Sequence, residues 1–191
     1  MTRVNRFLAA ISVLSLILFG GMACTKKENG AESEQAIAGA LKSDANGLSI
    51  AKATIKTVHG NIVFKFYPEK APNTVNRIVE LIKSGFYDGL TFHRVVPNFV
   101  IQGGDPTGTG TGGSGKKLKA EFNDVQHIRG TVAMARASDP DSADSQFYIA
   151  LTTLPHLDGS YTVFGQVVEG LELIDKVQKG DKMLSVVIEE K

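Results

Sequence analysis

From about residue 49 onward, the apolar and polar positions of the chain follow mainly the two-residue period of β-strands. Residues 50–58 are β-prone, and in residues 62–67 every second residue, beginning at Ile62, is a large apolar one. A strand with one buried face has this period, because successive side chains point to opposite sides of a sheet. The intervening residues 59–61 include glycine and asparagine and can turn the chain, so the two segments are expected to form a hairpin.

Two other segments have apolar residues at helical spacing. In the first, Pro72 suits the first helical turn, and Gly85 follows the last periodic residue and can end the helix. Between them, the apolar residues three or four positions apart are Val75, Ile78, Val79 and Ile82. A second, short helix is expected at a similar spacing around Leu171, Ile174 and Val177.

The remaining apolar runs are short and are separated by polar or glycine-containing segments. Strands are expected at residues 91–96, 98–102, 130–135, 146–151, 161–168 and 184–188. Together with the hairpin, this gives about eight short strands and two helices. The combination predicts a mainly β fold, a closed eight-stranded antiparallel β-barrel capped by two α-helices.

The first 48 residues differ from the domain that follows. Residues 1–23 have the parts of a signal peptide: basic residues near the start, an apolar stretch too short for a comfortable membrane span, and small residues before Cys24. The cleavage site resembles the bacterial lipobox, although Gly21 stands where that signal usually has leucine. We therefore expect a lipid anchor on Cys24, and ordinary secretion without lipidation is the alternative.

The region behind this anchor is expected to be a tether. Residues 24–48 are polar and small, so they can bury little apolar surface and would form a lipidated N-terminus and a flexible linker. The folded domain is then expected at residues 49–191, outside the cytoplasm, in the periplasm or on the cell surface. Cys24 is the one cysteine in the sequence, so the fold must be stabilised by its core without an internal disulfide. A net charge of +1 gives no support to nucleic-acid binding.

Glycine-rich residues 103–115 fit two nucleotide-binding patterns only superficially. Residues 108–113 match GxGxxG, but no helical pattern follows, as a dinucleotide site requires. Residues 110–117 nearly match the phosphate-binding loop, but Lys117 stands where Ser or Thr should hold the metal ion. The histidines lie at no metal-ligand spacing. We therefore expect neither a cofactor nor a metal.

The most specific signal is the run from Phe92 to Asp105, FHRVVPNFVIQGGD, which closely resembles the signature of the cyclophilin family. Further blocks that resemble the family follow in its order, at residues 134–137, 145–149, 157–159 and 163–165. The resemblance covers about residues 50–190. It implies a peptidyl-prolyl cis/trans isomerase that acts on proline-containing polypeptides.

The chemistry of that reaction explains which residues it needs. Rotation about an X-Pro bond removes amide conjugation and crosses a barrier of roughly 18–20 kcal/mol. No bond is made or broken, so the catalyst requires neither a nucleophile nor a metal. It requires an apolar pocket for the proline ring and a donor for the prolyl nitrogen, which regains a lone pair when the amide twists. A fixed cation beside that nitrogen stabilises the twisted state more than the planar one.

The resemblance assigns these roles to particular residues. Arg94 is expected to donate to the twisted amide, Phe99 to form the floor of the proline pocket, and Gln102 to bind the substrate backbone and orient Arg94. His93 is interpreted as a structural residue rather than a base. The remaining groove residues are expected to be Val100, Ala135, Arg136, Gln146, Tyr148, His156, Leu157 and Tyr161.

Two of these positions depart from the eukaryotic members of the family. His156 stands where they commonly have tryptophan, which contacts cyclosporin, and Tyr161 stands where they have histidine, so we expect weak cyclosporin binding with activity retained. The leading hypothesis is a monomeric folding catalyst for exported or envelope proteins. The alternative is a non-catalytic, proline-peptide-binding chaperone or surface-interaction lipoprotein. A purely structural lipoprotein is disfavoured, because it would not require Arg94, Phe99 and Gln102 together.

Overall fold

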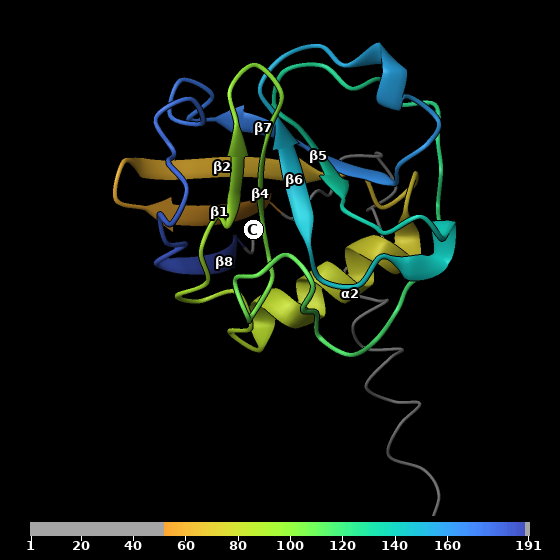
Figure 1. Ribbon diagram of the computed structural model, residues 1–191, viewed down its shortest axis with the longest axis horizontal. Helices are drawn as coiled ribbons and strands as arrows, with labels where there is room; N and C mark the ends of the chain where they lie inside the picture. The colour runs from red at the N-terminus through yellow and green to blue at the C-terminus, as the bar shows by residue number, and fades with distance from the viewer. Residues whose placement is uncertain (1–51, 190–191) are drawn as a thin grey trace, which may run out of the picture.

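Residues 52–189, the part of the chain that the computed structural model describes, contain eight strands, one α-helix and two short 3-10 helices, Pro140–Ser142 and Pro155–Leu157 (Figure 1). Each of the eight strands expected from the sequence is present. The elements, in chain order, are β1 (Lys52–Thr57), β2 (Gly60–Phe66), α2 (Pro72–Lys83), β3 (Arg94–Val96), β4 (Val100–Gly103), β5 (Thr131–Met134), β6 (Phe147–Ala150), β7 (Val163–Glu169) and β8 (Ser185–Glu189).

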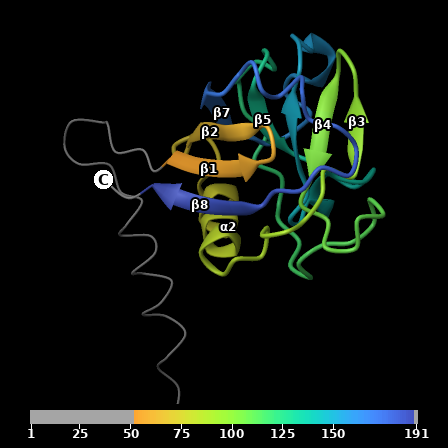
Figure 2. The ribbon, with the colours of Figure 1, turned by 90° about the vertical axis from the view of Figure 1, so that its left-hand side faces the viewer.

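The strands form one antiparallel sheet in the order β3-β4-β6-β5-β7-β2-β1-β8. The sheet is strongly curled, so β4 and β6 run across the direction of β1, β2 and β8, and α2 lies beneath β8 (Figures 1 and 2). The hairpin of β1 and β2 is confirmed, with its turn at residues 58–59, between the paired Thr57 and Gly60. Each strand therefore pairs with its neighbours in the sheet, and the terminal strands β3 and β8 each have one neighbour.

The prediction of a closed barrel is wrong, because the two terminal strands, β3 and β8, do not pair. The segments that precede them meet instead, through an isolated bridge between Thr91 and Lys182. Two backbone bonds flank it, from the Phe92 amide to the Asp181 carbonyl (2.9 Å) and from the Met183 amide to the Leu90 carbonyl (2.8 Å). Since β3 begins only at Arg94, after this contact, no ladder can extend along the seam. The fold is a curled half-barrel.

Strands β4, β5 and β6 are buried on both of their faces. In β6, Phe147 and Ile149 belong to the main core inside the curled sheet, whereas Tyr148 and Ala150 belong to a second apolar cluster on the opposite face. Strand β4 divides in the same way, because Ile101 joins the main core while its neighbours face the second cluster. The two-residue period of these strands thus separates a stabilising face from a second face that is available for a binding site.

The main core contains the alternating residues of β2. Ile62, Phe64 and Phe66 are at most 2% exposed, as the sequence pattern predicted. The Phe64 ring packs edge-on against the rings of Phe66 and Phe164, at centroid distances of 5.0 and 6.2 Å. Full burial of one such side chain contributes about 1.5–3 kcal/mol.

Helix α2 spans Pro72–Lys83 and buries the predicted apolar face. Its N-cap residue, Ala71, has no side chain that can accept a hydrogen bond. Glu121, distant in sequence, takes this role: one carboxylate oxygen accepts from the Asn73 amide (3.0 Å), and the other accepts from the Thr74 amide (2.8 Å). These are the amides that an N-cap side chain would normally satisfy, and a negative charge there also complements the helix dipole.

The second helix, expected around residues 171–177, is not formed. Ile174 and Val177 are buried as the pattern required, but the segment consists of turns with bonds from the Leu173 amide to Gly170 and from the Lys176 amide to Leu173. The Leu171 carbonyl accepts from Arg129 Nη2 at 3.1 Å. This long-range bond ties the turn segment to Arg129, while the amides of Leu173 and Lys176 bond three residues back rather than the four of an α-helix.

The expected signal peptide (1–23), the lipidated Cys24 and the tether (24–48) lie outside the described residues. Within residues 52–189, no helix combines the length and hydrophobicity of a membrane span.

The carboxylate cap predicts the effect of Glu121→Ala. This variant should lose about 1–2 kcal/mol of unfolding free energy, because two helix amides lose their acceptors. Urea denaturation of the domain measures the loss, with Glu172→Ala, at an exposed carboxylate, as the matched charge control. Equal stability of the two variants would contradict a capping role.

Candidate active site

A pocket of about 260 Å³ opens on the second face of the sheet, over the apolar side chains of the second cluster. It is lined by Arg94, Phe99, Val100, Gln102, Ala135, Arg136, Tyr148, Leu157 and Tyr161. All nine were expected site residues. The other two are adjacent: the His156 ring stacks on Phe99, with centroids 6.0 Å apart, and Gln146 hydrogen-bonds Gln102. The structure therefore brings the complete expected set together.

Strand register explains why residues from distant parts of the chain meet here. Arg94 on β3 lies opposite Gln102 on β4, and Gln102 lies opposite Tyr148 on β6. Ala133 on β5 lies on the other side of Tyr148. Directly opposed residues in antiparallel strands project to the same face, so the β3–β4 and β4–β6 ladders place Arg94, Gln102 and Tyr148 side by side.

Arg94 stands at the edge of the apolar pocket. Its guanidinium carbon is 5.5 Å from the centroid of the Phe99 ring, and its Nη1 donates to Gln102 Oε1 at 3.3 Å. The Arg94 side chain is exposed. The aromatic face attracts the cation and fixes its plane, while most of its N–H groups stay available to a ligand.

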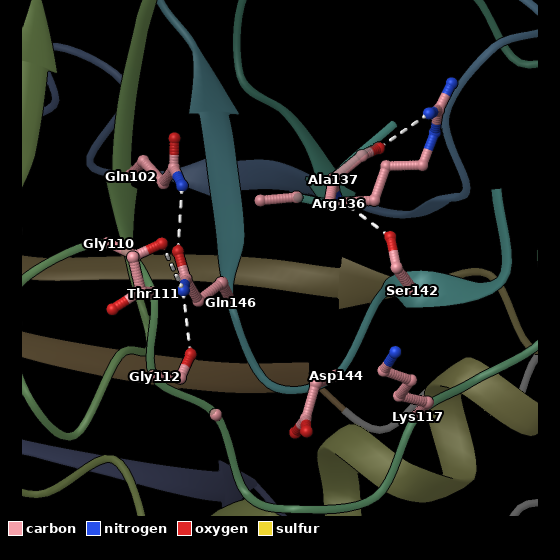
Figure 3. A pocket seen from close by; sticks show the side chains of 12 residues that line it. Gln102, Gly110, Thr111, Gly112, Lys117, Arg136, Ala137, Ser142, Asp144 and Gln146 are labelled. Carbon is pink, nitrogen blue, oxygen red and sulfur yellow. Dashed lines mark hydrogen bonds between the residues drawn. The ribbon is translucent and has the colours of Figure 1, made fainter. Parts of the chain in front are cut away.

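A polar chain continues from Gln102 into the glycine-rich loop (Figure 3). Gln102 Nε2 donates to Gln146 Oε1 at 2.9 Å. Gln146 Nε2 in turn donates to the carbonyls of Gly110 (3.0 Å) and Gly112 (2.8 Å). These bonds orient both amide side chains, so that Gln102 Oε1 faces Arg94 and accepts from it. No function was expected of this loop from the sequence. In the structure its backbone carbonyls hold Gln146, which holds Gln102 beside Arg94.

The loop itself is held by Asp105, which is 1% exposed. The carboxylate accepts from the Thr107 amide (2.7 Å), the Thr107 hydroxyl (2.8 Å) and the Gly110 amide (2.5 Å). Burial alone would raise the pKa of Asp105, but these hydrogen bonds outweigh it and hold the pKa well below its usual range. A Cβ at Gly112 would overlap Asp105, so glycine is required at that close approach.

A second pocket of about 400 Å³ adjoins the first and shares Gln102, Ala135 and Arg136 with it. The glycine-rich loop forms one side, and Lys117 and Asp144 lie on the side of the view away from Gln102 (Figure 3). Asp144 accepts from the backbone amides of Ser114 (2.6 Å) and Gly115 (3.0 Å). The groove therefore extends beyond the first pocket, and Lys117 and Asp144, which line this second part, were not among the residues expected from the sequence.

Arg136 is largely occupied by contacts within the protein. Its guanidinium carbon is 4.8 Å from the Tyr161 ring centroid, and Nη2 donates to the Ser160 carbonyl at 3.0 Å. Nη1 donates to the Ala137 carbonyl at 2.9 Å. Arg136 therefore joins the segment after β5 to the wall that carries Tyr161. A direct contact from Arg136 to substrate stays a prediction.

His93, next to Arg94, is buried, and burial lowers its pKa. Within residues 52–189 neither of its ring nitrogens has a hydrogen-bond partner. The ring packs against the loop at Gly110. This arrangement favours the structural interpretation of His93.

Comparisons with known proteins identify the family of this fold. Residues 52–190 match the family described as cyclophilin type peptidyl-prolyl cis-trans isomerase/CLD. A peptidyl-prolyl cis-trans isomerase of Helicobacter pylori is 50% identical over 141 residues, covering 72% of this chain and 86% of that protein. Peptidyl-prolyl cis-trans isomerase B of Bacillus subtilis is 50% identical over 130 residues, covering 67% and 90%.

A solved structure is also similar. The cyclophilin-type isomerase of Cryptosporidium parvum is 30% identical, with a TM-score of 0.69, and the match covers 75% of this chain and 99% of that one. The half-barrel and the gathered pocket thus define a peptidyl-prolyl cis/trans isomerase. The chain belongs to the cyclophilin family of these enzymes.

The pKa of Asp105 predicts part of the acid sensitivity of the domain. A carboxyl whose pKa is lowered on folding contributes stability that is fully present well above its unfolded pKa of about 3.9 and is lost as the pH falls towards the folded value. Asp105→Asn should therefore reduce the unfolding free energy at pH 7 by about 1–3 kcal/mol. It should also flatten the decline of stability below about pH 5.

Denaturant unfolding between pH 2 and 7 measures both effects, with Glu172→Gln as the exposed control. A decline as steep in Asp105→Asn as in the wild type would show that Asp105 does not contribute.

Proposed function

We propose that Arg94 catalyses the isomerisation by donating a hydrogen bond to the prolyl nitrogen of a twisted X-Pro amide. The observation that carries this proposal is the placement of its guanidinium at the edge of the apolar pocket, fixed by Phe99 and Gln102. A planar amide nitrogen is a poor acceptor, whereas the twisted one has a localised lone pair. The hydrogen bond is therefore stronger in the transition state, which is the condition for catalysis.

The pocket holds the proline ring during this rotation. Phe99 forms the floor, and Val100, Tyr148 and Leu157 form the walls. A related structure from Cryptosporidium parvum, 32% identical with a TM-score of 0.68, was determined in the presence of the dipeptide Ala-Pro. A dipeptide of this kind fits the chemistry of the pocket, which has an apolar interior and a cationic edge. Contacts to the ring are the same in both isomers, so they contribute affinity more than rate.

The polar chain supports Arg94 and extends the groove. Gln102 and Gln146 fix the guanidinium relative to the loop, so it does not have to be ordered when substrate arrives. Gln146, Ala135 and Arg136 line the path along which the chain preceding proline would run. Preorganised donors of this kind avoid reorganisation during the reaction.

Replacement of Arg94 tests the proposal. Arg94→Ala should lower kcat/KM for a proline peptide by about a hundredfold or more, because a transition-state hydrogen bond is lost. A protease-coupled or NMR exchange assay on residues 49–191 measures the loss. Lys56→Ala, at an exposed cation on β1, should keep wild-type activity. Full activity of a folded Arg94→Ala protein would overturn the assignment, and inactivity of the folded wild type would favour a non-catalytic binder.

We further propose that the enzyme assists the folding of exported or envelope proteins from a lipid anchor on Cys24. The support is the order of the N-terminal segments: basic residues, a short apolar stretch, small residues, cysteine and a polar linker. This order directs a domain across the membrane and leaves it tethered there. The linker of residues 24–48 would let one monomeric domain reach proline-containing segments of proteins that emerge from the membrane nearby.

Cell fractionation of the full chain in a bacterial host tests this second proposal. The wild type should be found with membranes and should incorporate labelled palmitate. Cys24→Ser should lose the label and leave the membrane fraction. An unlabelled, still exported wild type would favour ordinary secretion, and a wild type retained in the cytoplasm would exclude both routes.

A further inference from the structure

Behind the proline pocket, a buried histidine joins two of its walls. His127 is fully buried, and both of its ring nitrogens have partners. Nδ1 lies 2.9 Å from Asp158 Oδ1, and Nε2 lies 2.9 Å from the Tyr148 hydroxyl. The backbone amide of His127 also donates to Asp158 Oδ1, at 2.7 Å. The three residues form one continuous hydrogen-bonded chain, Asp158–His127–Tyr148.

Proton positions in this chain follow from the properties of its ends. The pKa of Asp158 is lowered, first by the backbone amide of His127 and then by its side chain, so the carboxylate is ionised and only accepts. Burial raises the pKa of Tyr148, which keeps its hydroxyl protonated. Because the carboxylate can only accept, the Nδ1–H of His127 donates to Asp158, and the Tyr148 hydroxyl lies within hydrogen-bond distance of Nε2.

The hydrogen-bonded chain Asp158–His127–Tyr148 connects elements that form different sides of the pocket. Tyr148 belongs to β6 and lines the pocket with its ring, while its hydroxyl is bound to His127. Asp158 follows directly on Leu157, which lines the pocket from another segment. The His127 and Tyr148 rings also stack, at 6.0 Å and 18°, and the Tyr161 ring meets both edge-on, at 6.4 and 5.7 Å.

We propose that His127 is a positioning residue that fixes the Tyr148 wall and the Leu157–Tyr161 wall of the proline pocket relative to each other. The order carboxylate, imidazole, hydroxyl resembles that of a hydrolase triad. Here, however, the hydroxyl contacts a histidine that is fully buried, where no substrate can reach it, and isomerisation forms no covalent bond. The chain therefore sets the width of the pocket and takes no part in the chemistry.

This inference rests on the proposed function, and it predicts a different kinetic effect from that of Arg94. The walls contact the proline ring in the planar and in the twisted state alike. A loosened wall should therefore raise KM and the peptide dissociation constant and leave kcat nearly unchanged. A residue that merely stabilised the fold would change neither quantity in the protein that remains folded.

Tyr148→Phe is the first variant, because it removes the hydroxyl and keeps the ring. It should raise KM and the dissociation constant of a proline peptide about three- to tenfold, the size expected for one lost buried hydrogen bond. Asp158→Ala should have a similar effect, and Asp158→Asn, which keeps an acceptor oxygen, should restore most of the affinity. Tyr67→Phe, a matched hydroxyl deletion outside the pocket, should behave as the wild type.

The double variant Tyr148→Phe/Asp158→Ala decides whether the chain acts as a unit. Its effect on KM should be clearly smaller than the product of the two single effects, since either change already breaks the link through His127. Multiplicative effects, or an unchanged KM in Tyr148→Phe, would overturn the proposal. Peptide titration measures the dissociation constant without turnover. An inactive wild type would refute the proposed function, and the dissociation constants of the variants would still test the positioning role of His127.

Discussion

The two-residue period of β4 and β6 is the constraint on which the rest of this structure depends. Along β6, Phe147 and Ile149 must face the main core, so Tyr148 necessarily faces the other side of the sheet. The same alternation in β4 sends Ile101 inward and Gln102 outward. A shift of one residue in either strand would exchange core and site residues, so the packing that stabilises the fold also fixes which side chains meet in the pocket.

Two hydrogen-bonded systems then refine the positions that the register provides. One lies along the surface of the groove, from the glycine-rich loop through Gln146 and Gln102 to Arg94. The other lies behind the pocket, from Asp158 through His127 to Tyr148. The first positions a cation that would recognise the twisted amide, and the second positions apolar walls that would recognise the ring. Rate and affinity would thus be supported by separate parts of one site.

Much of this organisation could be predicted from the sequence, because its signals are local. The alternation at residues 62–66 and the helical spacing after Pro72 gave the correct elements, and one family signature carried Arg94, Phe99 and Gln102 together. The open seam could not be predicted, because it depends on where β3 begins relative to residues 180–183. The helical spacing at residues 171–177 likewise predicted the buried residues but not the backbone, which forms turns with bonds three residues apart. A single histidine at position 127 belongs to no sequence pattern that would predict its hydrogen bonds to Tyr148 and Asp158.

The central claim is that Arg94 stabilises the twisted amide and contributes little to binding the planar one. Exchange NMR on a single proline peptide measures both quantities in one sample: the dissociation constant from the titration and the catalysed exchange rate from the cross-peaks. For Arg94→Ala, we expect a dissociation constant within about threefold of the wild type and an exchange rate lower by about a hundredfold or more. A variant that lost affinity and rate in equal measure at subsaturating peptide, with the rate recovered at saturation, would show that Arg94 holds the substrate and does not catalyse its rotation.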